Sequence, residues 1–237
     1  MIKKILKVIL GKMPILQKTV YRKASYSQSG EDLIVKYVFN SLGIKKPSYL
    51  DIGAHQPYYI SNTALLYQNG SRGVNIEPDP NLFTGINRAR RKDINLNCGI
   101  GKREGVMDFY VVNASTLNTF SKEEVESYSE QGDYKVVKTI PVLVKTLDSI
   151  LNEHFNGKFP DFLSVDVEGM DEEIIRSIDY ESSRPIVICV ETISFSNSGN
   201  GVKNNSIVDF LEGKGYMVYA DTNINTIFVP EDKWKHH

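Results

Sequence analysis

The stretch Tyr49–Leu66, "YLDIGAHQPYYISNTALL", sets the fold that the rest of the chain is expected to follow. A short apolar run ends around Asp51, and Gly53 follows where a strand would turn into a loop. Ser61 is a good N-cap for the apolar segment that comes next. This order of strand, loop and helix predicts the ligand-binding loop of a nucleotide-binding α/β fold. In such folds ligands bind beyond the carboxyl ends of the strands.

The loop lacks the glycines of a dinucleotide site. Such a site normally carries G-x-G-x-x-G after its first strand, which lets the backbone hold a pyrophosphate. Here His55 stands where a second glycine would be expected, and no glycine follows Gly53 until Gly70. The pattern therefore argues against NAD or FAD. His55 is expected to shape the loop by packing, to bind an acceptor hydroxyl, or to act as the base for that hydroxyl beside Asp166.

Strands and helices alternate through most of the chain. Strands are predicted at "SYLDI", "GVNIE", "INLNCGI", "VMDFYVV", "IPVLVKT", "FLSVDVEG" and "PIVICVET", and helices at residues 31–43, 61–70, 80–91, 147–155, 171–179 and 206–215. This alternation requires crossover connections and a mostly parallel sheet. "YMVYA" and "TIFVP" form a closing hairpin around residues 221–225, so one strand near the end must be antiparallel. Residues 113–138 are predicted to be a long irregular loop.

The bulk properties fit one globular domain. A chain of 237 residues with a net charge of -1 gives no sign of nucleic-acid binding. Cys98 and Cys189 both lie in predicted strands, which indicates buried free thiols and a reducing, cytoplasmic compartment. We predict one domain over residues 26–237, preceded by an extension of residues 1–25. The oligomeric state is left open.

The extension has a pattern of its own. In "MIKKILKVILGKMPILQK" apolar residues recur at helical spacing between lysines, up to Pro14. This predicts a basic amphipathic helix, for which two interpretations stay open. Residues 1–23 either lie on the anionic inner face of a membrane or pack on the chain's own domain. No segment approaches the length of a transmembrane helix.

A ligand without phosphates suits the predicted loops better than a dinucleotide. S-adenosylmethionine (SAM) carries a cationic sulfonium and amino group, and an aspartate at the first strand end favours a cation. A glycine there lets the backbone approach the ligand closely. The carboxylate of Glu77, at the second strand end, can accept hydrogen bonds from both ribose hydroxyls. The third predicted strand brings backbone groups to the adenine edge. The expected contacts are Asp51, Gly53, Ala54, Glu77, Pro78, Cys98 and Gly99.

The sequence also resembles the FkbM-type methyltransferases, which are SAM-dependent O-methyltransferases. The matching segments are "YSQSGEDLIV", "YLDIGAHQPYYISNTALLY", "GVNIEPDPNLF", "LSVDVEGMDEEII", "VICVET" and "GYMVYADTNINTIFV". The resemblance implies a Rossmann-like class I methyltransferase, whose seven-stranded, mostly parallel sheet has an antiparallel last strand. It also implies that Gln28 and Glu31 lie at the amino-acid end of SAM. Asn62 and Thr63, which cap the helix after the glycine loop, are expected to reach the ligand carboxylate.

Three carboxylates follow two further predicted strands. Asp166 and Glu168 stand in "SVDVEG", and Glu191 ends "CVET". An alcohol is a poor nucleophile unless its proton is removed or its oxygen is polarised. Two roles stay open. One carboxylate acts as a general base, or Asp166 and Glu191, together with His55, hold a divalent cation such as magnesium, manganese or calcium. Asp166 is also expected to contact the cofactor. A helix N-terminal cap is the structural alternative for Asp166 and Glu168.

These observations predict a SAM-dependent O-methyltransferase that acts on a hydroxyl group of a sugar or glycan. A bacterial surface polysaccharide or a glycosylated metabolite is the expected acceptor, because family members act mostly on sugars, polyketides and other natural products. An NAD-dependent sugar oxidoreductase is the enzymatic alternative, although the missing glycines argue against it. A SAM-binding domain without catalysis is the other alternative, and the intact set of carboxylates argues against that one.

Overall fold

The computed structural model describes residues 22–196 and 201–235. Most of residues 1–25 therefore lies outside the described residues, and both the amphipathic helix and its membrane contact stay predictions. Within the described residues, no helix combines the length and apolar character that crossing a membrane requires.

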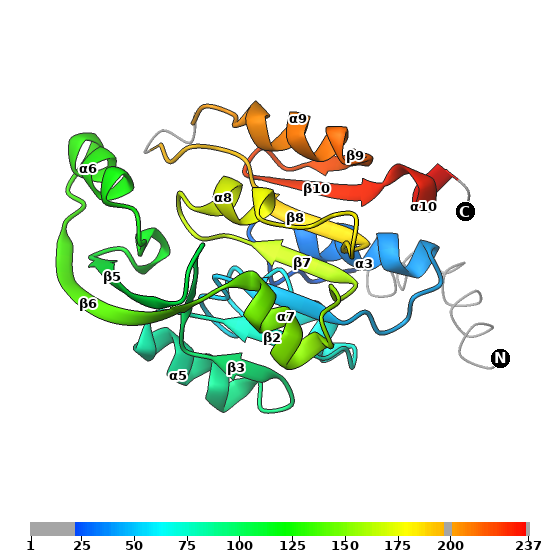
Figure 1. The fold of residues 1–237 in the computed structure, drawn as a ribbon, viewed down its shortest axis with the longest axis horizontal. Coiled ribbons are helices and arrows are strands. Elements are labelled where there is room, and N and C mark those ends of the chain that lie inside the picture. Colours follow the sequence, from blue (N-terminus) through cyan, green and yellow to red (C-terminus); the bar gives the residue numbers. More distant parts are fainter. Residues whose placement is uncertain (1–21, 197–200, 236–237) are drawn as a thin grey trace.

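A seven-stranded sheet forms the centre of the fold (Figure 1). Its strand order is β3-β2-β1-β7-β8-β10-β9. Neighbouring strands from β3 to β8 run parallel, whereas β10 is antiparallel to both β8 and β9. The predicted α/β fold, with its mostly parallel sheet and antiparallel last strand, is confirmed. The strands are β1 (Tyr49–Ile52), β2 (Gly73–Ile76), β3 (Ile94–Leu96), β7 (Phe162–Val165), β8 (Val187–Glu191), β9 (Tyr216–Asp221) and β10 (Asn225–Pro230).

Helices cover both faces of this sheet because its strands are apolar on both faces. Side chains alternate along a strand, so Leu50 and Ile52 pack on one face while Tyr49 packs on the other. The first face carries α7 (Leu147–Phe155), α8 (Asp171–Arg176) and α9 (Asn205–Gly213). The second face carries α3 (Glu31–Ser41) and α4 (Ala64–Gln68). Of the other helices, α5 (Pro80–Ala89) contacts β3 and α10 (Glu231–Lys235) contacts β10.

The region between β3 and α7 departs from the sequence prediction. "INLNCGI" forms two short strands instead of one, β3 and β4 (Gly99–Ile100). Between them the side-chain amide of Asn97 donates hydrogen bonds to the carbonyls of Glu77 and Pro78, which turns the chain out of the main sheet. β4 then pairs with β6 (Val136–Lys145), and β6 pairs with β5 (Gly105–Val112). These strands form a second sheet that extends away from the first, as Figure 1 shows.

The prediction of an irregular loop over residues 113–138 is wrong. The segment contains a 3-10 turn, η1 (Ser115–Leu117), and a helix, α6 (Lys122–Gln131). Ser121 caps α6, since its hydroxyl accepts a hydrogen bond of 3.1 Å from the backbone N–H of Glu124. Glu123 and Glu124 also place negative charge in the first turn, where the helix dipole favours it. The capping pattern S-x-x-E was the overlooked signal.

A fully buried arginine fixes the first strand to its surroundings. Arg90 has 0% of its surface exposed. Its guanidinium donates to Thr63 Oγ1 at 2.9 Å, Tyr49 Oη at 2.8 Å and Asp93 Oδ2 at 2.9 Å. Thr63 in turn donates to the carboxylate of Asp51. The network therefore compensates a buried positive charge with two buried carboxylates directly behind the end of β1.

We predict that Arg90→Ala destabilises the protein by about 3–5 kcal/mol, because it leaves the carboxylates of Asp51 and Asp93 buried without their cation. Equilibrium unfolding in urea measures the change. Arg88→Ala, at an exposed position on the same helix, is the control and should change stability by less than about 0.5 kcal/mol. An Arg90→Ala variant as stable as the control would show that the network does not support β1.

Candidate active site

A cavity of about 570 Å³ opens at the carboxyl ends of the central strands. Gly53 follows β1, Glu77 follows β2, Asp166 follows β7 and Glu191 ends β8, and all four line it. The sequence predicted this position, because the edge where parallel strands end is where ligands bind in such sheets.

The floor of the cavity is a close contact between two loops. Gly53 has φ +83°, and a Cβ atom added to it would lie 1.8 Å from the carbonyl oxygen of Asp166. The N–H of Gly53 donates to Ile76 O at 3.0 Å, and the N–H of Asp166 donates to Ile52 O at 3.0 Å. Only glycine fits at this position, both for its backbone angle and for the space. The loops after β1 and β7 are therefore held side by side.

Glu77 lies at one end of the cavity and is almost fully buried. Its Oε2 accepts the N–H of His55 at 2.8 Å, and its Oε1 accepts the N–H of Asp79 at 2.8 Å. Burial raises the pKa of Glu77 to about 8, against the lowering effect of these two hydrogen bonds. Each oxygen keeps a second lone pair, so the carboxylate can still accept hydroxyl groups from a ligand.

Apolar side chains form the wall next to Glu77. The lining residues there include Pro78, Leu82, Gly99, Ile100, Phe109 and Phe120. A Cβ atom on Gly99 would lie 2.4 Å from the ring of Phe120, so this glycine keeps the wall closely packed. The two phenylalanines come from β5 and from the loop before α6, and no local sequence pattern predicts that they line this cavity.

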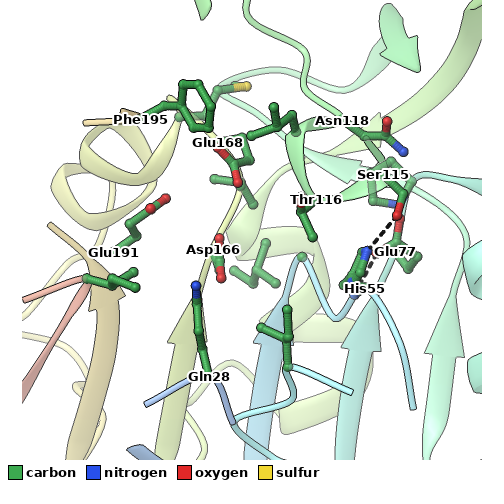
Figure 2. A pocket seen from close by; sticks show the side chains of 18 of the residues that line it. Gln28, His55, Glu77, Ser115, Thr116, Asn118, Asp166, Glu168, Glu191 and Phe195 are labelled. Carbon is green, nitrogen blue, oxygen red and sulfur yellow. Dashed lines mark hydrogen bonds between the residues drawn. The ribbon is translucent and has the colours of Figure 1, made fainter. Parts of the chain in front are cut away.

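His55 lies on the same side as Glu77. Its backbone has a φ of +50°, and its Nε2 is 3.2 Å from Ser115 Oγ. Burial lowers the pKa of His55, although Asp79 opposes this effect, so the ring is favoured in its neutral form. Figure 2 shows His55 and Ser115 together, apart from the carboxylates of Asp166 and Glu191.

The carboxylates of Asp166, Glu168 and Glu191 gather at the other end of the cavity (Figure 2). One oxygen from each of them lies within 4.8 Å of the other two. Among the described residues this is the group that could hold a metal ion. The set predicted from the sequence, Asp166, Glu191 and His55, is therefore not the one the structure brings together, because Glu168 takes the place expected for His55.

Burial and mutual repulsion make these carboxylates hard to ionise. Burial is the larger cause that raises the pKa of Glu168 and of Glu191, and the charge of Asp166 adds to it in both cases. Burial also raises the pKa of Asp166, with Asp171 as the next cause. At neutral pH the group therefore keeps part of its protons, and a member that is ionised is a stronger base than an ordinary carboxylate.

The other residues predicted to contact a cofactor divide into two sets. Gln28 lines the cavity and points toward Asp166 in Figure 2. Six others are not among the lining residues: Glu31, Asp51, Ala54, Asn62, Thr63 and Cys98. All six are buried. The carboxylate of Glu31 accepts a hydrogen bond of 2.7 Å from the hydroxyl of Thr222, which ties the N-terminal segment to the closing hairpin.

Comparison with known proteins identifies the family. Residues 51–218 match the family model described as the methyltransferase FkbM domain. The chain belongs to the FkbM methyltransferase family. Its family and fold are thus those of SAM-dependent methyltransferases, as the sequence motifs predicted, and the NAD-dependent alternative loses its support.

The solved structures to which this chain is similar include three that are described as methyltransferases. A putative RNA methyltransferase from Pyrococcus horikoshii is 10% identical, with a TM-score of 0.43 over 96% of this chain and 98% of the other. A putative caffeoyl-CoA O-methyltransferase from Staphylococcus aureus is 11% identical, with a TM-score of 0.43 over 97% and 100%. A TehB-like SAM-dependent methyltransferase from Corynebacterium glutamicum is 9% identical, with a TM-score of 0.41 over 96% and 100%. No curated protein matches the sequence.

We predict that Glu191→Gln stabilises the methyltransferase at pH 8 and not at pH 5. The pKa of Glu191 is raised in the folded state, so stability that is present at low pH is lost as the pH rises above the ordinary range of a carboxyl group. The neutral amide avoids this loss. Thermal unfolding in chelator should show a Tm increase on the order of 2–4 °C at pH 8.

The matched control for this substitution is Glu212→Gln, at an exposed position on α9. It should leave Tm unchanged at both pH values. A Glu191→Gln variant that is less stable than the wild type at pH 8 would contradict the explanation that burial and repulsion raise the pKa of Glu191.

Proposed function

We propose that this methyltransferase transfers a methyl group from SAM to a hydroxyl group of a sugar or glycan. One observation carries the proposal. A single cavity has a ribose-binding type of carboxylate, Glu77, at one end and three clustered carboxylates of raised pKa at the other. The first end suits the cofactor of the family, and the second suits the removal of a proton from an alcohol.

The residues around Glu77 fit SAM. The carboxylate of Glu77 would accept the ribose hydroxyls, and the apolar wall with Pro78 and Gly99 would enclose the adenine. Gln28 would bind at the amino-acid end, where the N-terminal segment lines the cavity. When bound, SAM supplies an electrophilic methyl group. His55 would hold Glu77 through its backbone N–H and close the same end of the cavity with its ring.

The three carboxylates would prepare the acceptor. Glu168 is our choice for the general base, because its Oε2 already accepts the hydroxyl of Tyr128 at 3.0 Å and its Oε1 has no such partner. The proton of the acceptor hydroxyl would pass to Oε1 of Glu168, which leaves the oxygen as the nucleophile. Asp166 and Glu191 would hold the hydroxyl in place, so that the orientation of the acceptor contributes most of the rate.

The surroundings of the carboxylates support an acceptor that is polyhydroxylated and not anionic. A second cavity of about 420 Å³ shares Glu168, Glu191 and Phe195 with the first. Glu124, Asp171 and Glu172 also line it. Among the described residues that line either cavity, the one lysine or arginine is Lys203. Its Nζ atom is paired with Asp221 at 2.7 Å. Carboxylates bind hydroxyl groups well, the ring of Phe195 offers an apolar surface, and an anionic group would be repelled.

A bound cation is the second candidate for activating the hydroxyl. The clustered oxygens of Asp166, Glu168 and Glu191 suit magnesium, manganese or calcium, which prefer oxygen ligands. In that case the three carboxylates would hold the ion, and the ion would polarise the acceptor oxygen.

We predict that Glu168→Gln lowers kcat for methyl transfer by about 10²–10⁴-fold, because the amide cannot take the proton. The affinity for SAM, measured by calorimetry, should stay within about two-fold, since Glu77 and its wall are unchanged. The assay follows labelled methyl from SAM into a panel of neutral sugars and glycans, and Glu212→Gln is the control. Full turnover by both Glu168→Gln and Asp166→Asn would overturn the proposal.

The same assay separates the base from the cation. We expect turnover to survive exhaustive chelation, because a carboxylate of raised pKa can act alone. Loss of turnover on chelation, followed by recovery on addition of magnesium, manganese or calcium, would instead assign the three carboxylates to a metal site.

A further inference from the structure

One short segment holds both the backbone and the side chain of Glu168. The hydroxyl of Thr119 donates to the carbonyl oxygen of Glu168 at 2.6 Å. The hydroxyl of Tyr128, one helix further along, donates to Oε2 of Glu168 at 3.0 Å. Both residues belong to the part of the chain between the second sheet's strands β5 and β6, which lies outside the seven-stranded sheet. Glu168 therefore follows a strand of the seven-stranded sheet, whereas the two hydroxyl groups that hold it come from the connection between β5 and β6 of the second sheet.

The backbone at Glu168 needs such support. Glu168 has a φ of +51°, and Gly169 has a φ of +97°. A residue with a side chain costs roughly 1–3 kcal/mol in the left-handed region, and such residues persist where their surroundings fix them. α6 packs directly onto this turn, because a Cβ atom on Gly169 would lie 2.5 Å from Cγ of Glu124.

Electrostatic repulsion acts against the position of Glu168 as well. When they are ionised, the carboxylates of Asp166, Asp171 and Glu124 repel that of Glu168. Without a donor, its carboxylate would be expected to turn away from Asp166 toward the open side of the cavity. The hydroxyl of Tyr128 is the side-chain donor that opposes this tendency.

Tyr128 is itself held rigidly. It is 1% exposed, and its ring packs edge-on against Phe195 with 4.9 Å between the ring centroids. Ser121 caps the helix that carries it, and the N–H of Ser121 donates to Thr119 Oγ1 at 2.9 Å. Thr119, Ser121 and Tyr128 therefore form one connected support, and a fixed support is what can keep a base within reach of its substrate.

We propose that Tyr128 is a positioning residue, which together with Thr119 keeps Oε1 of Glu168 directed at the acceptor hydroxyl. This inference rests on the proposed function, because it takes Glu168 as the base. It assigns the segment from Thr119 to Tyr128 a role in the rate of the reaction, beyond forming the wall of the cavity.

The test compares Tyr128→Phe with Tyr134→Phe. Tyr134 packs on the same Phe195 ring, with 5.3 Å between the centroids, and no hydrogen bond joins it to Glu168. Tyr128→Phe should lower kcat on the order of ten-fold, which is the effect of one lost hydrogen bond to a charged group. KM for the acceptor and the affinity for SAM should change by less than about two-fold, and Tm should fall no further than in Tyr134→Phe.

Substitutions at Thr119 provide an independent check. Thr119→Val removes the hydroxyl that holds the carbonyl of Glu168, and it should lower kcat as Tyr128→Phe does. Thr119→Ser keeps the hydroxyl and should retain most of the wild-type kcat. A Tyr128→Phe variant with wild-type kcat would overturn the proposal. So would a loss of kcat that Tyr134→Phe shares, since it would reflect only the packing of the aromatic cluster.

Crystal structures separate this proposal from the proposed function. If the wild type transfers no methyl group to any hydroxyl acceptor, the proposed function fails. The positioning role of Tyr128 is then tested by the electron density for the Glu168 side chain alone. The carboxylate should leave its position in Tyr128→Phe and keep it in Tyr134→Phe, and an unmoved carboxylate in Tyr128→Phe would overturn the positioning role.

Discussion

The close contact between Gly53 and Asp166 is the constraint on which the site depends. A residue with a side chain at position 53 would collide with the carbonyl of Asp166, so the ends of β1 and β7 can meet only at a glycine. Their meeting places the loop of His55, whose backbone N–H donates to Glu77, beside the loop that carries Asp166 and Glu168. One cavity can then hold a cofactor and a base at the same time. The buried network around Arg90 supports this arrangement from behind β1.

The cluster of Asp166, Glu168 and Glu191 lowers the stability of the folded protein but suits the transfer of a proton. Three acidic groups whose oxygens lie within 4.8 Å of one another repel, and their partial burial weakens the screening of this repulsion by water. A fold optimised for stability alone would replace them with apolar residues. Here the chain instead adds support from a second sheet and from α6, which hold Glu168 at an unfavourable backbone angle. A strained backbone that the surrounding structure maintains around one carboxylate is typical of a residue that acts on a substrate.

Much of the fold could be predicted from the sequence, because its signals are local. The alternation of apolar strands with capped helices predicted the parallel sheet, and the hairpin around Asn223 predicted the antiparallel strand. The site could be predicted only in part. Asp51 stands at the end of its strand as expected, yet its side chain faces Thr63 and the network of Arg90, a partner 39 residues away whose position no local pattern shows. Similarly, the place of His55 beside Ser115 depends on how the second sheet folds back.

The most direct test of this account is a crystal structure of the methyltransferase with S-adenosylhomocysteine. The account predicts that the ribose hydroxyls lie on the carboxylate of Glu77, that the adenine lies between Pro78 and Gly99, and that the sulfur faces Asp166 and Glu168. A ligand bound in the reverse direction, or bound outside this cavity, would contradict the account.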